Sequence, residues 1–410
     1  MKLLNIIFLI CCLGLVIIKS QAQNELSRIN LNYKYDPEAE VLCKYRVAVS
    51  GNNATIFVRL SFNEEKGSFP LDYQVSYELR NSYEDISPAV TENLNENNVI
   101  PTEETSNQYF QFQVPVIENS TLVVLRVTNA TANQQFIFDI PVDLPLDFPK
   151  TSLVVMEKDR EIPIFKDYVS HQDTFRIVSV NNNVPQAHFF LYSKNFSPAD
   201  PPMALRGGQV DRELNIDSTF TVNSNERLRI NKKGLYFIQQ DSTTLEGISL
   251  LITDPYFPQL VKAETLIEPL IYISTGRESK RIKDAENKKK AMDTYWLDLT
   301  KSPERARNII REYYRQVSEV NYLFTTYKEG WKTDQGMILQ LFGKPDGVYL
   351  NGESEEWVYQ RKGAMSRIKF NFVKVKNFFT DHHYELVRNP SYDREWYRTV
   401  DLWRKGRQEI

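Results

Sequence analysis

The chain has 410 residues, of which 41% are hydrophobic and 25% are charged. These proportions are those of folded globular proteins and exclude a disordered or collagen-like chain. Fifty basic and 53 acidic residues give a net charge of −3, which makes nucleic acid a poor partner. The length is sufficient for two or three domains that each bury a core of their own.

The first 22 residues are typical of a secretory signal. Lys2 precedes an apolar run over residues 3–18, and Lys19-Ser20-Gln21-Ala22 supplies a small-x-small cleavage site. The run is shorter than the roughly 20 residues that a membrane-spanning helix needs. We therefore expect an exported mature protein without a transmembrane span, an uncleaved N-terminal anchor being the alternative.

The three cysteines of the sequence do not indicate a disulfide or a lipid anchor. Cys11 and Cys12 lie inside the apolar run, which does not suit lipidation, and cleavage leaves Cys43 alone. An internal disulfide is then excluded, and we expect Cys43 to be a small buried side chain on a strand.

Residues 23–145 predict a first antiparallel β-sandwich. Apolar and polar side chains alternate with period two, which is typical of strands with one buried face. The clearest stretches are 56–62, 73–79, 110–116, 122–127 and 136–140. Turns rich in Asn, Gly, Pro and Ser separate them.

A second sandwich is predicted over residues 150–254. Three prolines within 141–149 favour a stiff, extended connector before it, because proline fixes φ and lacks an N–H donor. The strand-like runs that follow are 153–156, 175–180, 187–192, 220–222, 235–239 and 248–252.

The pattern becomes helical after residue 258. Helices are expected over 260–273 and 281–299, and a third begins with Ser302 as N-cap and Pro303 in the first turn. Its apolar stripe extends to Tyr327, with Gly330 placed to stop it. Strands are expected at 337–342, 356–360, 368–375 and 384–387, followed by a short helix at 395–404. Residues 258–410 are therefore predicted to form an α+β domain with helices on one face of an antiparallel sheet.

Charge changes at the same boundary. Residues 23–254 hold 20 basic and 31 acidic residues, whereas residues 255–410 hold 28 basic and 22 acidic residues. Either two solvated surfaces differ in sign, or the basic end faces an acidic partner. Lys288-Lys289-Lys290, expected in the middle of a helix, has the same two interpretations.

One motif is distinctive, the stretch Gly330-Trp331-Lys332-Thr333-Asp334 and the turn that follows it. Thr333 and Asp334 suit hydrogen bonds to backbone N–H groups two or three residues on, and Gly336 suits a positive φ. Trp331 is expected to bury its ring against the third helix. Gly343 and Pro345 are expected to shape the exit from the motif, with Asp346 capping the turn.

This stretch resembles the signature of the GWxTD-domain family, exported proteins of Bacteroidetes-type Gram-negative bacteria. The resemblance extends over residues 260–405 and includes Trp357-Val358-Tyr359. It implies a periplasmic or outer-membrane-associated protein with β-rich modules before the signature domain. It implies no mechanism.

Chemistry-bearing clusters are scarce. His382 and His383 are adjacent on a predicted strand, so they should point to opposite faces and cannot chelate one metal together. Asp381 and Glu385 could join one of them, but we expect neither a metal nor a cofactor.

The carboxylates of the motif are the best catalytic candidates. Asp334 and Asp346 lie in tight turns beside aromatic residues, where pKa values shift. Without a base, nucleophile or metal they define no reaction, so capping of turns is the preferred interpretation. Glu353, Glu355 and Glu356 are expected at a solvated hairpin tip.

The sequence therefore predicts a non-catalytic scaffold that holds an envelope protein partner, in envelope assembly or secretion, and leaves peripheral membrane contact open. Burial of a partner around Trp331 is the expected mechanism. One alternative is a glycan-binding module that uses exposed aromatic residues among Trp357, Tyr359, Tyr392 and Trp396. A hydrolase that uses Asp334 and a second carboxylate is the third hypothesis.

Overall fold

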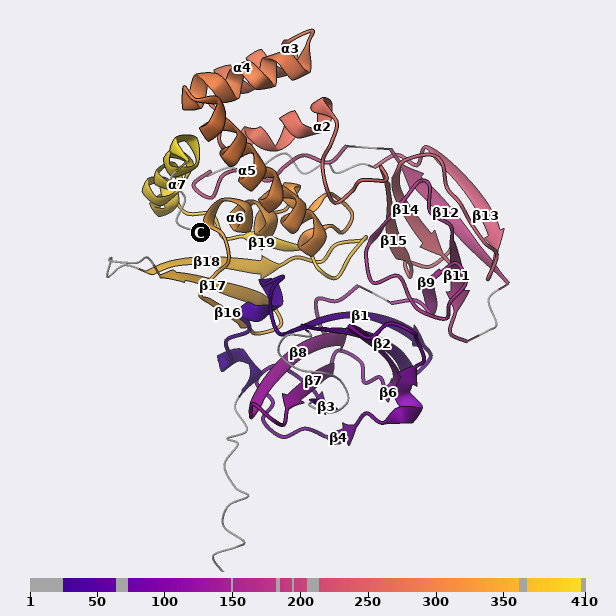
Figure 1. Cartoon of the computed structure of the whole chain (residues 1–410). Coiled ribbons are helices and arrows are strands. Elements are labelled where there is room, and N and C mark those ends of the chain that lie inside the picture. Colours follow the sequence, from indigo (N-terminus) through magenta and orange to yellow (C-terminus); the bar gives the residue numbers. More distant parts are fainter. Residues whose placement is uncertain are drawn as a thin grey trace, which may run out of the picture.

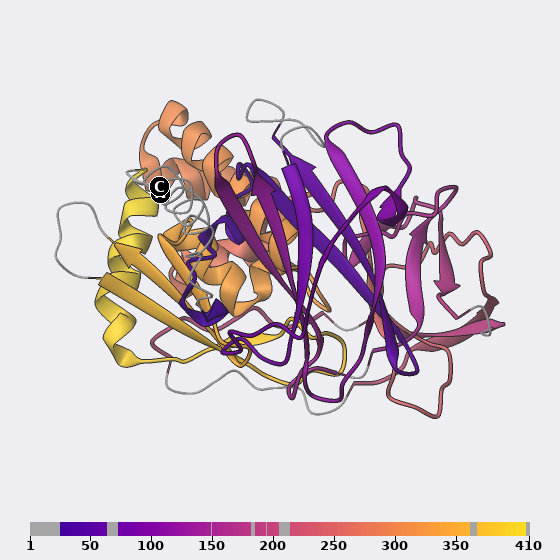
Figure 2. The ribbon, with the colours of Figure 1, turned by 90° about the horizontal axis from the view of Figure 1, so that it is seen from below.

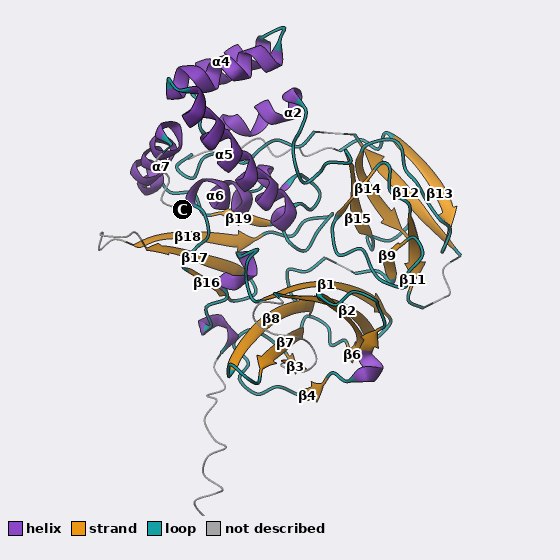
Figure 3. Ribbon diagram, viewed as in Figure 1, coloured by secondary structure: helices purple, strands orange, loops and turns teal. Residues whose placement is uncertain are grey.

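The computed structural model describes residues 25–63, 73–148, 150–181, 185–193, 195–204, 214–360 and 367–406. The expected secretory signal, residues 1–22, lies outside the described residues. The chain forms two β-rich units and a C-terminal unit in which the longer helices gather (Figures 1 and 3). The first β-rich unit lies below the other two in Figure 1, so in the view from below it is in front of them (Figure 2).

The first unit is an antiparallel sandwich, as predicted. One sheet contains β1 (Val41–Ser50), β2 (Asn53–Phe62), β6 (Asn107–Pro115) and β5 (Val99–Ile100), in that order. The other contains β4 (Val90–Asn93), β3 (Tyr73–Arg80), β7 (Thr121–Asn129) and β8 (Gln134–Asp143), and a short 3₁₀ helix, η3 (Glu96–Asn98), precedes β5. The apolar residues of the alternating stretches meet between the sheets in one core. β8 continues through Pro141 to Asp143, so the proline-rich connector is shorter than predicted.

The second unit packs a five-stranded sheet on a two-stranded one. The larger sheet contains β10 (Tyr168–Ser170), β15 (Ile248–Thr253), β14 (Gly234–Gln239), β12 (Gln186–Tyr192) and β13 (Ser218–Asn223), and the smaller contains β11 (Phe175–Ser179) and β9 (Leu153–Glu157). All six predicted strands are present. β10, which the sequence pattern did not indicate, pairs in parallel with β15.

The C-terminal unit is α+β, as predicted. Its antiparallel sheet contains β16 (Gly347–Leu350), β17 (Ser354–Gln360), β18 (Arg367–Lys374) and β19 (Tyr384–Leu386). Its α-helices are α2 (Ala263–Ile267), α3 (Gly276–Asp284), α4 (Lys288–Thr300), α5 (Pro303–Phe324), α6 (Asp334–Phe342) and α7 (Asp393–Lys405). Three 3₁₀ helices complete it, η4 (Glu268–Tyr272), η5 (Gly330–Lys332) and η6 (Pro390–Tyr392). The helices lie above the sheet in Figure 1, and the first sandwich lies below it.

The long helix α5 begins as predicted, but two other helices are divided. The Ser302 side chain accepts a hydrogen bond from the Arg305 backbone N–H at 3.4 Å, and Pro303 is the first helical residue. The predicted helix over 260–273 is α2 followed by η4, where Pro269 supplies no N–H donor. The predicted helix over 281–299 is α3 and α4, with Asn287 capping the second. Lys288-Lys289-Lys290 therefore lies in a first turn rather than in mid-helix.

The predicted strand at 337–342 is wrong, because these residues belong to α6. The run Asp334 to Leu341 is buried on every side, so its sequence shows neither the period of two nor that of 3.6. A short apolar run of this kind does not distinguish a buried strand from a buried helix. The N-cap at Thr333 decides the outcome.

Residues 25–40 form a separate N-terminal segment before the first strand. It contains two short 3₁₀ helices, η1 (Leu26–Arg28) and η2 (Asn32–Tyr35). The Leu26 backbone N–H donates to the carbonyl of Tyr83 in the first sandwich, and that of Leu31 donates to the carbonyl of Val348 on β16. The segment thereby joins the first sandwich to the C-terminal sheet.

Candidate functional site

The GWxTD residues form a compact turn between α5 and α6. Thr333 Oγ1 accepts a hydrogen bond from the Gly336 backbone N–H at 2.9 Å and donates to the Gly330 carbonyl at 2.7 Å. The predicted capping role of Thr333 is therefore confirmed. The two bonds fix η5 and the start of α6 against each other.

The two glycines of the turn are required by close packing. A Cβ on Gly330 would lie 2.0 Å from the Val320 carbonyl oxygen on α5, and a Cβ on Gly336 would lie 1.9 Å from the Gly330 carbonyl oxygen. Gly330 does not stop the long helix, which ends at Phe324, and Gly336 has no positive φ. Both predictions were wrong because spacing along the chain does not show which backbone atoms approach across space.

Trp331 anchors the turn to α5. Its side chain is 2% exposed, and its backbone N–H donates to Asn321 Oδ1 at 3.1 Å. Its ring meets Tyr272 of η4 edge-on, with ring centroids 6.1 Å apart. The sequence predicted this burial against the third helix.

Asp334 is held in an ion pair across the unit. Its Oδ2 accepts from the Leu386 backbone N–H at 2.9 Å, and its Oδ1 lies 2.5 Å from Arg388 Nη2. The prediction that it bonds backbone groups two or three residues on was wrong. Burial raises the pKa of the Asp334 carboxyl, while Arg388 and the Leu386 N–H oppose this shift.

Gly343 shapes the end of the motif, as predicted, because its φ of +75° ends α6. Pro345 is buried beside it. The exposed Asp346 accepts from the Gln360 backbone N–H at 2.5 Å, and the buried Tyr359 hydroxyl donates to the Gly343 carbonyl at 2.9 Å. Asp334 and Asp346 thus have separate partners and do not form a carboxylate pair.

Glu355 is not at a solvated hairpin tip, although polar residues, Ser354 and Glu356, stand on both sides of it in the sequence. It is 3% exposed, and its carboxylate accepts from Tyr35 Oη at 2.8 Å, Gln335 Nε2 at 3.0 Å and Trp357 Nε1 at 3.0 Å. These donors come from the N-terminal segment, α6 and β17. The alternation of β17 was the available signal, since it places Glu355 on the same face as Trp357.

The aromatic residues considered for polymer binding do not form an exposed groove. Trp357, Tyr359 and Trp396 are buried in the core of the C-terminal unit. Tyr392 is half-buried, and its hydroxyl donates to the Lys369 carbonyl at 2.8 Å. Among the four candidates only Tyr392 keeps part of its surface exposed, because the rings of the other three fill the space between sheet and helices.

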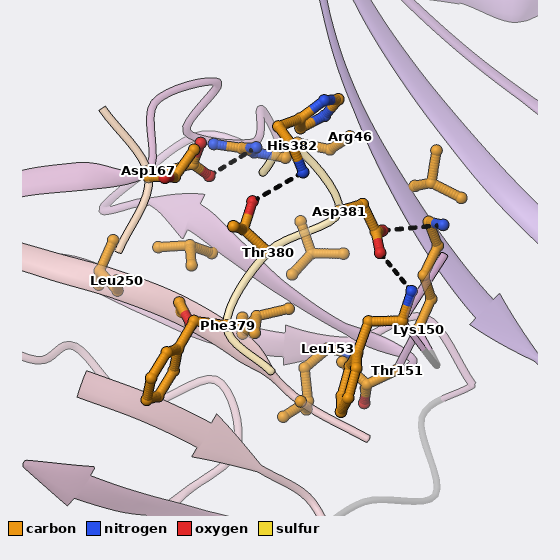
Figure 4. A pocket seen from close by; sticks show the side chains of 18 of the residues that line it. Arg46, Lys150, Thr151, Leu153, Asp167, Leu250, Phe379, Thr380, Asp381 and His382 are labelled. Atoms are coloured by element: carbon orange, nitrogen blue, oxygen red, sulfur yellow. Dashed lines mark hydrogen bonds and ion pairs between the residues drawn. The ribbon is translucent and has the colours of Figure 1, made fainter. Parts of the chain in front are cut away.

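A cavity of about 150 Å³ lies where the three units meet (Figure 4). Arg46 of β1 pairs with Asp167 of the second unit at 2.9 Å. Lys150 pairs with Asp381 of the C-terminal unit at 2.9 Å. These pairs connect residues far apart in the sequence, and no sequence signal indicated them.

The two adjacent histidines have different surroundings. His382 lines this cavity and lies 3.4 Å from Tyr45 Oη, whereas His383 Nε2 lies 3.3 Å from a Glu385 carboxylate oxygen. Among the described residues, no three His, Cys, Asp or Glu side chains gather as a metal site. Cys43 is half-buried on β1, and burial raises the pKa of its thiol to about 12.

A groove of about 430 Å³ lies on the surface beside the signature turn. Trp331 is among its lining residues, together with β14, β15 and the segment after β15. The stretch after β12, η4 and the residues before the motif also contribute, with Phe196, Glu268 and Tyr327. Tyr256 and Val261 on this segment are 61% and 53% exposed. They are exposed apolar side chains next to the motif.

The signature turn connects the long helix α5 to the antiparallel sheet, because Trp331 bonds Asn321 of α5 and Asp334 bonds Leu386 of β19. The family model of the GWxTD domain matches residues 234–405, so the chain contains a GWxTD domain. The match begins at β14, within the second unit. No curated protein matches the sequence.

Two solved structures are similar to parts of the chain. HBP35 of Porphyromonas gingivalis is 9% identical over 52% of this chain and 64% of its own, with a TM-score of 0.20. Escherichia coli alpha-2-macroglobulin activated by porcine elastase is 12% identical over 53% of this chain and 24% of its own, with a TM-score of 0.13. The chain thus spans less than two thirds of either. Scores this low carry no inference about fold or function.

Proposed function

We propose that this protein is an exported, envelope-associated scaffold that docks a protein partner in the groove beside the signature turn. The GWxTD domain and the signal-like first 22 residues favour export. Among the described residues, no helix combines the length and apolar character needed to cross a membrane.

The groove itself is the observation that carries the proposal. Its exposed apolar side chains, Tyr256 and Val261, are bordered by a polar rim in which Asp254 pairs with Lys233 at 2.9 Å and Lys262 at 3.1 Å. An apolar centre with a charged rim is the usual arrangement at protein interfaces. The expected occupant is a protein segment that inserts an apolar side chain between Tyr256 and the turn.

The motif carboxylates support a non-catalytic role. Both oxygens of Asp334 are occupied by partners inside the fold, and Asp346 bonds the backbone of β17. Removing such a group affects stability first. The hydrolase hypothesis therefore has no geometric support at these residues.

Site-specific photo-crosslinking tests the docking surface. A photoreactive amino acid is placed at position 256 or 261 in the bacterium that makes the protein, with Tyr397 as the matched control. Tyr397 lies on α7 and is 59% exposed, so it has the same accessibility away from the groove. We expect one discrete crosslinked species from 256 and 261 that is absent from 397.

The partner identified by crosslinking is then purified, and its affinity for wild type and for variants of this chain is measured. Tyr256→Ala should weaken binding by about tenfold or more, as expected for an aromatic anchor, with an unchanged melting temperature. Equal crosslinking at all three positions, or equal affinity for the variant, would refute the docking surface. Trp331→Ala is unsuitable because it opens the core.

A further inference from the structure

Three cations at the junction of the units have no carboxylate partner. Lys44 on β1 and Arg59 on β2 face each other directly across the sheet. Lys166 precedes β10 in the second unit. Within the described part of the chain, none of the three forms an ion pair, and the neighbouring Asp167 is already bound to Arg46 at 2.9 Å.

Two tyrosines complete this cluster. Tyr322 of α5 accepts a hydrogen bond from Arg59 Nη2 at 3.2 Å, and its ring centroid lies 5.1 Å from Lys44 Nζ. Tyr168 is 5% exposed, and its buried hydroxyl has no hydrogen-bond partner among the described residues. The same holds for the Nε of Arg59. Buried donors without a partner are costly, and Tyr168, unlike Arg59, lines a cavity from which a ligand could supply the acceptor.

The cluster borders a cavity of about 190 Å³. Lys44, Lys166, Tyr168 and Tyr322 all line it, so all three units contribute to its wall. The ring of Phe165 lies 5.6 Å from the Arg59 guanidinium carbon and adds an apolar surface. Three carboxylates also line the cavity, and each already has a partner: Asp139 bonds Lys34, Asp167 bonds Arg46 and Glu355 bonds Tyr35. The donors left for a ligand are the two lysines and the Tyr168 hydroxyl.

Without a ligand, the charged side chains of this cluster are energetically unfavourable. Burial, together with the charge of Arg59, lowers the pKa of Lys44 to about 8. Burial also lowers the pKa of Lys166, with a contribution from Arg59. The main counter-charge, Asp167, opposes the shift at Lys44 but is already paired with Arg46. Shifted pKa values of this kind cluster at functional sites.

We propose that this cluster binds the phosphate group of a phosphorylated ligand. A phosphate dianion balances the unpaired charge better than a single carboxylate does, and its oxygens accept hydrogen bonds from the ammonium groups of Lys44 and Lys166 and from the Tyr168 hydroxyl, which all line the cavity. Arg59 does not line the cavity and contributes only its charge. The proposal is independent of the protein partner at the outer groove.

Thermal melts and calorimetry of the full mature chain test the site. Inorganic phosphate is the probe, with acetate and chloride at the same ionic strength as comparisons. We expect a saturable rise in melting temperature with phosphate that the other two anions do not produce.

Variants separate a ligand site from a structural cluster. Lys44→Met keeps the apolar contact with Tyr322 and removes one cation, so the variant should melt higher than wild type without phosphate and show no phosphate-dependent rise. Lys289→Met, at an exposed position on α4, is the matched control and should behave as wild type. Tyr168→Phe retains the ring and should bind phosphate about tenfold more weakly.

Phenyl phosphate distinguishes the two sources of the phosphate group. Tighter binding than inorganic phosphate indicates an ester whose organic part contacts Phe165 and Tyr168, and equal binding indicates free phosphate. Either result supports the site. An identical response to phosphate and acetate, or an undiminished phosphate response in Lys44→Met, would overturn the proposal.

Discussion

Replacement of Asp334 by alanine tests whether the signature turn is architectural. The change leaves the Leu386 N–H buried without its acceptor and the Arg388 guanidinium without its counter-ion. Breaking a buried ion pair by removing one partner costs about 3–5 kcal/mol. Because the Arg388 side chain keeps 17% exposure, water offsets part of this loss, and we expect about 3 kcal/mol.

Urea unfolding followed by tryptophan fluorescence measures this loss in the relevant unit. All five tryptophans lie between residues 296 and 403, so the signal reports on the C-terminal unit alone. Asp346→Ala is the control, since that exposed carboxylate bonds one backbone N–H and should cost only about 1 kcal/mol. The double variant Asp334→Ala/Arg388→Met should recover more than about 1 kcal/mol, because it removes the unpaired charge.

Unchanged or increased stability in Asp334→Ala would refute this reasoning. A functional carboxylate held at an energetic cost behaves in that way, because its removal relieves strain. Asp334 would then be a candidate catalytic residue. A loss of stability equal to that of Asp346→Ala would also contradict the buried ion pair.

Three further predictions concern the same unit. Gly330→Ala should destabilise it by about 3 kcal/mol or more, since the added Cβ meets backbone on α5, whereas Gly276→Ala, with open space around its Cβ, should cost less than about 1 kcal/mol in the same urea assay. Tyr35→Phe removes the hydroxyl bound to Glu355 and should cost about 2 kcal/mol, and a change below about 0.5 kcal/mol would show that the N-terminal segment is not anchored there. An arginine of α7 holds the pKa of Glu278 at about 2, below its usual 4.5, so the carboxylate contributes stability above pH 4.5 that is lost as the pH falls towards 2. The stability difference between wild type and Glu278→Gln should therefore shrink over that interval, and a constant difference would contradict the shift.

Local patterns predicted most of the secondary structure. The alternation in β2, β3 and β7 indicated strands because each has one face in a core and one outside it. The start of α5 followed from its cap, since Ser302 and Pro303 act on the adjacent backbone. Residues of α6 gave no such signal because they are buried on all sides.

The sequence by itself determined the presence of the signature motif, the burial of Trp331 and the capping role of Thr333. These features depend on residue type and on neighbours within a few positions. Only the tertiary structure decided that Glu355 is buried and that Asp334 meets Arg388. Besides the nearby Trp357, the Glu355 carboxylate meets Gln335 and Tyr35, which lie 20 and 320 residues away along the chain. Arg388 lies 54 residues from Asp334, and no local pattern encodes these distant partners. The cavity of about 190 Å³ beside Lys44 has the same origin, since residues of all three units line it.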